Sequence, residues 1–187
     1  MTFGDTAIGY WIFLLLAALW IMIPAYVPNS AAAVFGGGTP IDLGKLWSDG
    51  RRVFGDGKTY RGFLGGMFCG ILAGLVEIWV WSSFNLTALP RQTLLSIALL
   101  AAGALLGDLV KSFFKRRLGK ERGESWPLAD QYDLVIGSFV LILLVYPQWL
   151  FENITLPIAA WIVIITPILH RVVNIIGYYI GVKEVPW

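Results

Sequence analysis

Five long apolar stretches dominate the chain, and each is close to the length that a helix needs to cross a membrane. They cover residues 8–27, 62–81, 92–110, 132–150 and 156–180. A bilayer core takes roughly 20 apolar residues per helix. The pattern therefore predicts an all-α integral membrane protein with five transmembrane helices. No second domain and no internal repeat is visible in the pattern, so residues 1–187 are expected to form a single polytopic membrane domain.

Prolines, glycines and one acid mark the first two stretches. Pro24 and Pro28 stand near the end of the first, so its helix is expected to kink or stop there. Gly66, Gly70 and Gly74 recur at every fourth position of the second, a spacing that lets two helices approach closely. Glu77, the charged residue of that stretch, is expected to make a helix-packing contact towards the outer leaflet.

Two long polar loops, residues 30–61 and 111–130, carry most of the positive charge. Of 14 Lys and Arg residues, five lie in the first loop and six in the second, whereas the two short links hold only Arg91. The positive-inside rule predicts that both loops are cytoplasmic, with the N-terminus outside and the C-terminus in the cytoplasm. Residues 41–53 of the first loop are expected to include a short interfacial helix.

Composition narrows the class of protein further. The chain is 57% hydrophobic and 14% charged, whereas soluble domains carry about 25% charged residues. A single cysteine, Cys69, excludes an internal disulfide and a cysteine-rich zinc site. The net charge of +2 says little about partners, and no nucleic-acid partner is expected.

Residues 55–62 of the first loop, Gly-Asp-Gly-Lys-Thr-Tyr-Arg-Gly, combine small residues with charge just before an apolar stretch. Their Gly-Lys-Thr looks like the end of a Walker A loop, but Arg52 stands where that motif needs a glycine, which argues against a P-loop NTPase. Free backbone N–H groups at a helix start bind anions, although a flexible loop with ordinary charges remains an alternative. The anion-binding candidates are Gly55, Asp56, Gly57, Lys58, Thr59 and Arg61.

Three carboxylates lie where apolar stretches meet the second loop. Asp108 stands at the end of the third stretch, and Asp130 and Asp133 stand three residues apart at the start of the fourth, so the latter two share a helical face. An acid within a membrane segment is by default a functional candidate, and carboxylates hold hard cations. The three residues therefore predict a metal site, although Asp130 is also explained by the dipole of a helix start.

The basic residues of the second loop divide into two groups. If the third helix continues, Lys111 and Lys115 share a face with Asp108, which makes them the better candidates for phosphate binding. Their neighbours are explained by topology and by contacts with anionic headgroups. His170 is expected to be a structural histidine, and Asn29 alone is typical of a cap or turn.

Taken together, these motifs resemble those of a known family, the CDP-archaeol synthases, which are similar to the C-terminal part of CDP-diacylglycerol synthases. The resemblance covers most of the chain and is carried by residues 24–30, 39–42, 55–62 and 107–138. The broader family carries a histidine in the stretch that corresponds to residues 126–133, and this chain has none there. The difference favours the archaeal branch.

The resemblance implies transfer of CMP from CTP to an unsaturated isoprenoid di-ether glycerol phosphate, which gives CDP-archaeol and pyrophosphate in phospholipid biosynthesis. It also implies Mg²⁺ and an active site at the cytoplasmic face of the cell membrane. The implied catalytic residues are Asp108, Asp133 and Lys111, with Asp108, Asp130 and Asp133 as metal ligands. The implied nucleotide-binding residues are Asn29, Gly55, Asp56, Gly57, Lys58, Thr59 and Arg61, and Arg51, Arg52 and Lys115 are implied to contact phosphate or the lipid headgroup.

Other functions stay open at this point. A small ion-coupled transporter would use Asp108, Asp133 and Glu77 as an ion path, although most of the charge lies in loops on one side. A CDP-diacylglycerol synthase-type enzyme would act on ester lipids instead. A CDP-alcohol phosphotransferase is disfavoured because its Asp-rich signature is absent. The sequence leaves open the oligomeric state and the number of metal ions.

Overall fold

The computed structural model describes residues 6–183, 185 and 186, and within them all regular structure is helical. The helices are α1 (Ala7–Val34), α2 (Tyr60–Ser83), α3 (Leu94–Arg117), α4 (Ala129–Val145), α5 (Pro147–Asn153) and α6 (Leu156–Tyr179). Helices α1, α2, α3 and α6 are each long and apolar enough to cross a membrane, and the bent pair α4–α5 is a candidate for a fifth span. The prediction of an all-helical, multi-pass membrane protein is confirmed.

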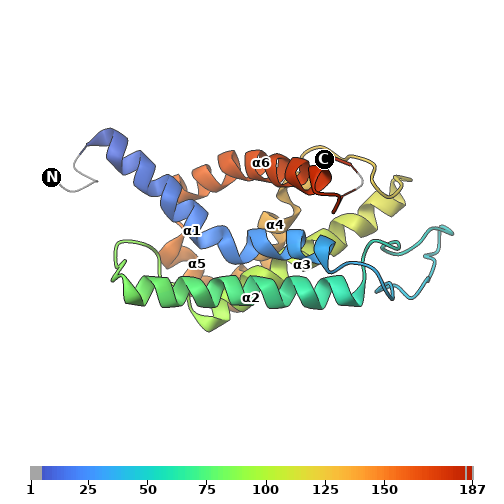
Figure 1. Ribbon diagram of the computed structural model, residues 1–187, viewed down its shortest axis with the longest axis horizontal. Helices are drawn as coiled ribbons and strands as arrows, with labels where there is room; N and C mark the ends of the chain where they lie inside the picture. The colour runs from blue at the N-terminus through green and yellow to red at the C-terminus, as the bar shows by residue number, and fades with distance from the viewer. Residues whose placement is uncertain (1–5, 184, 187) are drawn as a thin grey trace.

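The helices form an elongated bundle with different loops at its two ends (Figure 1). Helix α2 lies along one side, α6 along the other, and α1 runs between them. The loop between α1 and α2, the loop between α3 and α4 and the end of α6 all lie at one end of the bundle. The start of α1, the link between α2 and α3 and the short helix α5 lie at the opposite end.

Helix α1 passes through both of its prolines and ends only at Val34, so of the two predicted outcomes, a kink or a stop, the stop is wrong, and the first loop begins later than residue 30. Figure 1 shows the helix bending midway along its length. A proline ring removes one helical hydrogen bond, and Pro28 thereby leaves the carbonyl of Pro24 without its usual partner. That carbonyl faces α2, since a Cβ on Gly70 would lie 3.0 Å from it.

The glycines of α2 lie against neighbouring helices, as their spacing predicts. A Cβ on Gly66 would lie 2.6 Å from the carbonyl oxygen of Pro28, and one on Gly74 would lie 2.5 Å from a methyl group of Ile97 in α3. Glu77, one turn beyond Gly74, is buried. Within the described part of the chain, however, neither of its carboxyl oxygens has a hydrogen-bond partner.

The tightest contact in the fold joins α3 to α4. A Cβ on Gly107 would lie 2.1 Å from the carbonyl oxygen of Asp133, and one on Gly137 would lie 2.2 Å from the carbonyl oxygen of Gly103. Real Cβ atoms never approach so closely, so only glycine fits at these positions. The hydroxyl of Ser138 adds a hydrogen bond of 2.8 Å to the carbonyl oxygen of Leu100. The two backbones therefore run almost in contact.

The fourth apolar stretch is not one straight helix, so the expectation of a single helix over residues 132–150 is wrong. Helix α4 ends at Val145, and α5 begins at Pro147 with a bend of 120°. Proline lacks the N–H that would continue the helix, and it pushes the preceding residue out of the α region. Tyr146 accordingly has φ −141°.

Three tryptophans fasten the link between α2 and α3 at the end of the bundle opposite the long loops. The indole N–H groups of Trp20, Trp81 and Trp149 donate hydrogen bonds of 3.1, 3.0 and 3.0 Å to the carbonyl oxygens of Pro90, Leu89 and Arg91. The three indoles come from α1, α2 and α5. The link therefore holds three helices together. The hydrogen bond from Trp149 to Arg91 also explains why α5 folds back against the bundle.

The structure shows turns and an isolated bridge where a short interfacial helix was expected over residues 41–53, so that expectation is wrong. Three residues in this segment have positive φ, namely Leu43 (51°), Gly44 (80°) and Gly50 (75°). A right-handed helix cannot include such residues. The segment is instead folded around the side chain of Asp42, described below.

We expect Gly107→Ala to destabilise the protein by about 1–3 kcal/mol, because the new methyl group forces α3 and α4 apart. Thermal unfolding in detergent measures the effect. The control is Ile136→Ala, since that α4 side chain is 61% exposed on the outside of the bundle. A Gly107→Ala protein that melts with the wild type would contradict the contact described here.

Candidate active site

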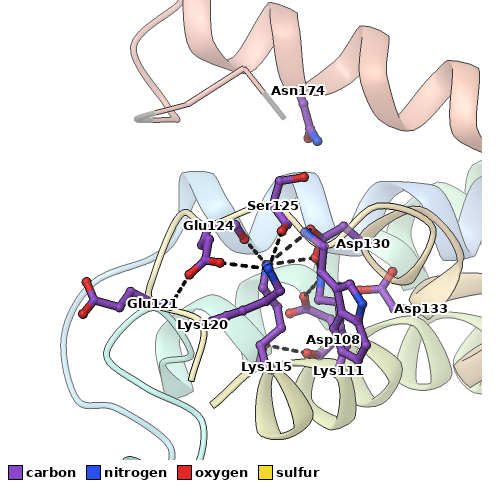
Figure 2. Close-up of polar contacts among 12 residues, drawn as sticks. Asp108, Lys111, Lys115, Lys120, Glu121, Glu124, Ser125, Asp130, Asp133 and Asn174 are labelled. Carbon is purple, nitrogen blue, oxygen red and sulfur yellow. Dashed lines mark hydrogen bonds and ion pairs between the residues drawn. The ribbon is translucent and has the colours of Figure 1, made fainter. Parts of the chain in front are cut away.

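Three carboxylates converge on one lysine at the end of the bundle that carries the long loops (Figure 2). The Nζ atom of Lys111 lies 3.0 Å from Asp108 Oδ1, 3.3 Å from Asp130 Oδ1 and 2.7 Å from Asp133 Oδ2. Asp108 and Lys111 are three residues apart on α3, and Asp130 and Asp133 are three apart on α4, so each pair shares a helical face. The glycine contact between α3 and α4 brings the two faces together.

Two more lysines complete the charges around these acids. Lys58, just before α2, places its Nζ atom 2.5 Å from Asp108 Oδ2. Lys115, one turn beyond Lys111, lies 3.1 Å from Asp130 Oδ1 and donates to the carbonyl oxygen of Glu124. We call Lys58, Asp108, Lys111, Lys115, Asp130 and Asp133 the charge cluster. Its aspartate side chains are at most 17% exposed, and removing one partner from such a buried network leaves an uncompensated charge.

Asp130 and Asp133 also have structural contacts. Asp130 Oδ2 accepts a 2.7 Å hydrogen bond from the backbone N–H of Trp126, which holds the turn before α4. Asp133 Oδ1 accepts a 2.6 Å bond from the N–H of Leu134. The alternative explanation of Asp130 as a helix-start residue therefore has a contact that supports it, beside its ion pairs with lysine.

Asp42 organises the first loop around itself. Its carboxylate accepts hydrogen bonds from the guanidinium of Arg52 and from the backbone N–H groups of Gly44, Phe54 and Gly55. Burial alone would raise the pKa of Asp42, but these hydrogen bonds outweigh it and hold the pKa well below its usual range. The carboxylate therefore stays charged, and the loop conformation is retained, across the physiological pH range.

Arginines tie the first loop to the end of α3. Arg52 bridges Asp42 and Asp56 with contacts of 2.5 Å to each. The Nη1 atom of Arg51 donates 3.1 Å hydrogen bonds to the carbonyl oxygens of Arg116 and Arg117. The first loop is thereby fixed to the end of α3.

Two adjoining cavities border the charge cluster. The inner cavity, of about 370 Å³, lies between α1, α2, α3, α4 and α6. Its polar lining includes Asn29, Asp108, Asp130, Asp133, His170 and Asn174. It extends towards the middle of the bundle as far as Tyr26, whose hydroxyl lies 2.8 Å from the Thr166 hydroxyl. Leucines from α3, α4 and α6 supply much of the remaining wall.

The basic cavity, of about 830 Å³, opens beside the inner one and is lined from both long loops. Its positive side chains include Arg51, Arg52, Lys58, Lys111, Lys115 and Arg116. Gly55, Asp56 and Gly57 contribute to the same wall. A concentration of cations with glycine backbone beside them suits a ligand with several phosphate groups.

The other residues that the sequence suggested for nucleotide binding lie in different surroundings. Asn29 borders the inner cavity, and its Oδ1 atom is buried with no hydrogen-bond partner in the described portion of the chain. Thr59 borders the same cavity, but its hydroxyl already caps α2 by accepting a 3.1 Å bond from Gly62. Arg61 donates to the carbonyl oxygens of Phe35 and Gly36 and is absent from the described lining of both cavities. Its nucleotide-binding role stays a prediction.

Sequence reasoning missed the contribution of α6 to the inner cavity. Thr166, His170 and Asn174 all line it, and they are spaced at every fourth position. Polar residues at that spacing share one face of a helix, so the periodicity in an otherwise apolar stretch was the available signal. His170 had been expected to be structural, and it does lie beside Asn174, with 3.2 Å between its Nε2 and Asn174 Nδ2.

The carboxylates fit a hard cation by their chemistry, although the described residues include no group of three acids, histidines or cysteines arranged around a metal position. Asp108, Asp130 and Asp133 instead share the ammonium of Lys111. Three carboxylates that already surround one positive charge offer the oxygen donors that Mg²⁺ prefers.

Comparisons with known proteins identify the family of the chain. Residues 11–187 match the model of a CarS-like family described as CDP-archaeol synthase. A CDP-archaeol synthase of Methanoculleus marisnigri is 78% identical over 166 residues, which cover 89% of this chain and all of that protein. A CDP-archaeol synthase of Methanoregula boonei is 59% identical over the same shares of the two chains.

One solved structure is also similar, with a TM-score of 0.71 and 34% sequence identity over 86% of this chain and 94% of that one. It is described as an intramembrane enzyme for archaeal membrane lipids biosynthesis. The family model spans nearly the whole chain, and the relatives match over their full length. The chain therefore belongs to the CarS-like family of CDP-archaeol synthases.

Proposed function

We propose that this protein is a membrane cytidylyltransferase that transfers CMP from CTP to an unsaturated archaeal di-ether glycerol phosphate. The products are CDP-archaeol and pyrophosphate, and the reaction belongs to phospholipid biosynthesis. The observation that carries the proposal is the charge cluster, which lies between a basic cavity and a largely apolar one. The names of the relatives support the substrate class.

The reaction needs little covalent chemistry from the protein. An oxygen of the lipid phosphate attacks the α-phosphorus of CTP and forms a new P–O bond. The bond between the α-phosphorus and the oxygen that bridges to the β-phosphorus breaks, and its electrons leave with pyrophosphate. Positioning of the two anions and neutralisation of their charge supply most of the catalysis. Lys58, Lys111 and Lys115 lie where they can neutralise both substrates.

Mg²⁺ is the proposed cofactor. Asp108 and Asp133, together with Asp130, would hold it, and bound Mg²⁺ supplies positive charge against the phosphate oxygens. Lys111 would then lie beside the metal site, where its ammonium already balances part of the negative charge of the three carboxylates. Arg51 and Arg52 would bind the outer phosphates from the loop side, where they line the basic cavity.

Asn29 is the proposed reader of the cytosine base. Its buried Oδ1 atom borders the inner cavity and lacks a hydrogen-bond partner within the residues that the structure describes. Cytosine carries an exocyclic amino group that donates hydrogen bonds, whereas uracil presents a carbonyl oxygen at that position. A bound cytosine would satisfy the orphaned oxygen, and a uracil would not.

The proposed topology has five passes, with the α4–α5 pair as the fourth. Both long loops are on the same end of the bundle, as the positive-inside rule requires (Figure 1). We place that end, with the charge cluster, in the cytoplasm, together with the C-terminus, and we place the N-terminus outside. The lipid phosphate would reach the cluster from the membrane, and its isoprenoid chains would stay among the apolar side chains on the outside of the helices.

The alternatives fit less well. A transporter needs an ion path that joins Asp108 and Asp133 to Glu77, but the two aspartates are bound to lysines and Glu77 has no polar partner among the described residues. A CDP-diacylglycerol synthase-type enzyme for ester lipids is disfavoured because the relatives are CDP-archaeol synthases.

Asp133→Asn tests the function and its metal. It keeps the size of the side chain but removes a charge, and we expect CDP-lipid formation to fall by about 100-fold or more at ordinary Mg²⁺. The assay measures turnover against Mg²⁺ concentration in detergent. Asp49→Asn is the matched control, because Asp49 pairs with Arg117 outside the charge cluster. Near-normal turnover in Asp133→Asn would rule out the metal assignment.

Asn29→Ala tests base recognition. We expect it to reduce the preference for CTP over UTP by about 10-fold, since one hydrogen-bond acceptor for the cytosine amino group is lost. Competition between the two nucleotides in one reaction measures the ratio directly. A preference equal to that of the wild type would exclude Asn29 as the reader of the base.

Cysteine labelling tests the topology on a Cys69→Ala background. With an impermeant thiol reagent, we expect single cysteines at Ser48 and Ser125, in the two long loops, to react only after the membrane is opened. A cysteine at Thr87, in the link at the opposite end, is expected to react in sealed cells. Labelling of Ser48→Cys from outside would refute the orientation.

A further inference from the structure

The end of α6 carries a turn that reverses the chain. Gly181 has φ 75°, the N–H of Val182 donates to the carbonyl oxygen of Gly177 at 2.9 Å, and the N–H of Gly181 donates to that of Tyr178 at 3.1 Å. This is the pattern of a Schellman motif, which needs a residue with positive φ just past the helix. The N–H of Lys183 also donates to Gly177, at 3.0 Å. The turn therefore lays Lys183 back along the last turns of α6.

The side chain of Lys183 then runs along α6 towards the candidate site. Its stem packs on Gly177, where a Cβ would lie 3.4 Å from Lys183 Cγ. Its Nζ atom donates to Oδ1 of Asn174, which is 3% exposed. Figure 2 shows Asn174 pointing from α6 across the site towards the aspartates and lysines of α3 and α4. Asn174 therefore holds the ammonium of Lys183 on the α6 side of the cavities, opposite the charge cluster on α3 and α4.

Lys183 lies at the junction of the two cavities. It and Lys58 are the lysines found in the described lining of both. Burial is the main cause that lowers the pKa of Lys183, and the positive charges of Lys111 and Lys58 lower it further, whereas Asp108 and Asp130 act in the opposite direction. Neither of these carboxylates forms an ion pair with Lys183 among the described residues, and its ammonium is held by Asn174 instead.

Its partner distinguishes Lys183 from the lysines of the charge cluster. Lys58, Lys111 and Lys115 each lie within 3.3 Å of an aspartate oxygen. Lys183 has no ion pair with any described carboxylate, and the oxygen that holds it belongs to a neutral amide. A half-buried ammonium that has no carboxylate partner within the described part of the chain, in a wall shared by two cavities, is suited to receive an anion.

We infer that Lys183, positioned by Asn174 and by the turn at Gly181, forms a phosphate-binding subsite at the junction of the two cavities. The subsite rests on the proposed function, because its ligand is a phosphate group of one of the two substrates. Asn174 holds the ammonium in place without neutralising it, so an incoming phosphate oxygen competes with an amide and not with a carboxylate. Asn174 and Gly181 are positioning residues, whereas Lys183 contacts the ligand.

Lys183→Met tests the subsite in the full-length protein in detergent, with CTP and the lipid phosphate varied separately. We expect the KM for one substrate to rise about 10-fold or more, with a smaller change in kcat, since a charge-assisted hydrogen bond is lost. A raised KM for the lipid assigns the subsite to the lipid phosphate, and a raised KM for CTP assigns it to the nucleotide. Lys183→Arg should restore most of the affinity.

Two further variants separate binding from folding. Arg171→Met removes an exposed cation of α6 that lines neither cavity, and it should leave both KM values unchanged. Asn174→Asp keeps the size of the side chain but adds a carboxylate that neutralises Lys183, so it should raise the same KM as Lys183→Met does. If the KM values are unaltered in both Lys183→Met and Asn174→Asp, the subsite is overturned. This holds even if the variants have a lower thermal stability than the wild type. A wild-type protein that forms no CDP-lipid refutes the proposed function instead.

Discussion

The close contact between α3 and α4 is the constraint on which the site depends. Carboxylates repel one another, and two helices with normal side chains between them would hold Asp108 and Asp133 too far apart to share one cation. Glycine at Gly103, Gly107 and Gly137 removes the intervening side chains, so the carbonyl oxygen of Asp133 lies directly against α3. The energy of that packing keeps the acids together, and Lys111 offsets their repulsion.

The charge cluster tolerates its buried position because each of its carboxylates is paired with a lysine. Each aspartate has a lysine within 3.3 Å, and the lysines come from two places in the chain: Lys58 from the segment just before α2, and Lys111 and Lys115 from the last turns of α3. A network with this many partners keeps its charges compensated while one member moves to a ligand. A phosphate that enters the basic cavity therefore meets cations that are already oriented, and little reorganisation accompanies binding.

The sequence predicted the features that follow from local pattern, and it failed where distant segments decide the outcome. Apolar runs located the spans, and the three-residue spacings placed Asp108, Asp130, Asp133 and Lys111 on faces that do meet. The continuation of α1 through Pro24 and Pro28 depends on glycines of α2 that accept the proline surface. The fold of the first loop depends on Asp42, whose backbone partners lie up to 13 residues further along the chain. No local propensity reports either contact.

The position of Lys183 shows how a short chain can place cations on two sides of its ligand. The segment just before α2 and helix α3 supply Lys58 and Lys111 from one side of the site, but α6 is apolar along most of its length and ends without a basic residue in its last turn. A reversed turn after α6 delivers the cation of Lys183 to the opposite side of the site from beyond the end of the helix. An anion at the junction of the cavities would then be held from two sides, which fixes its orientation as well as its charge.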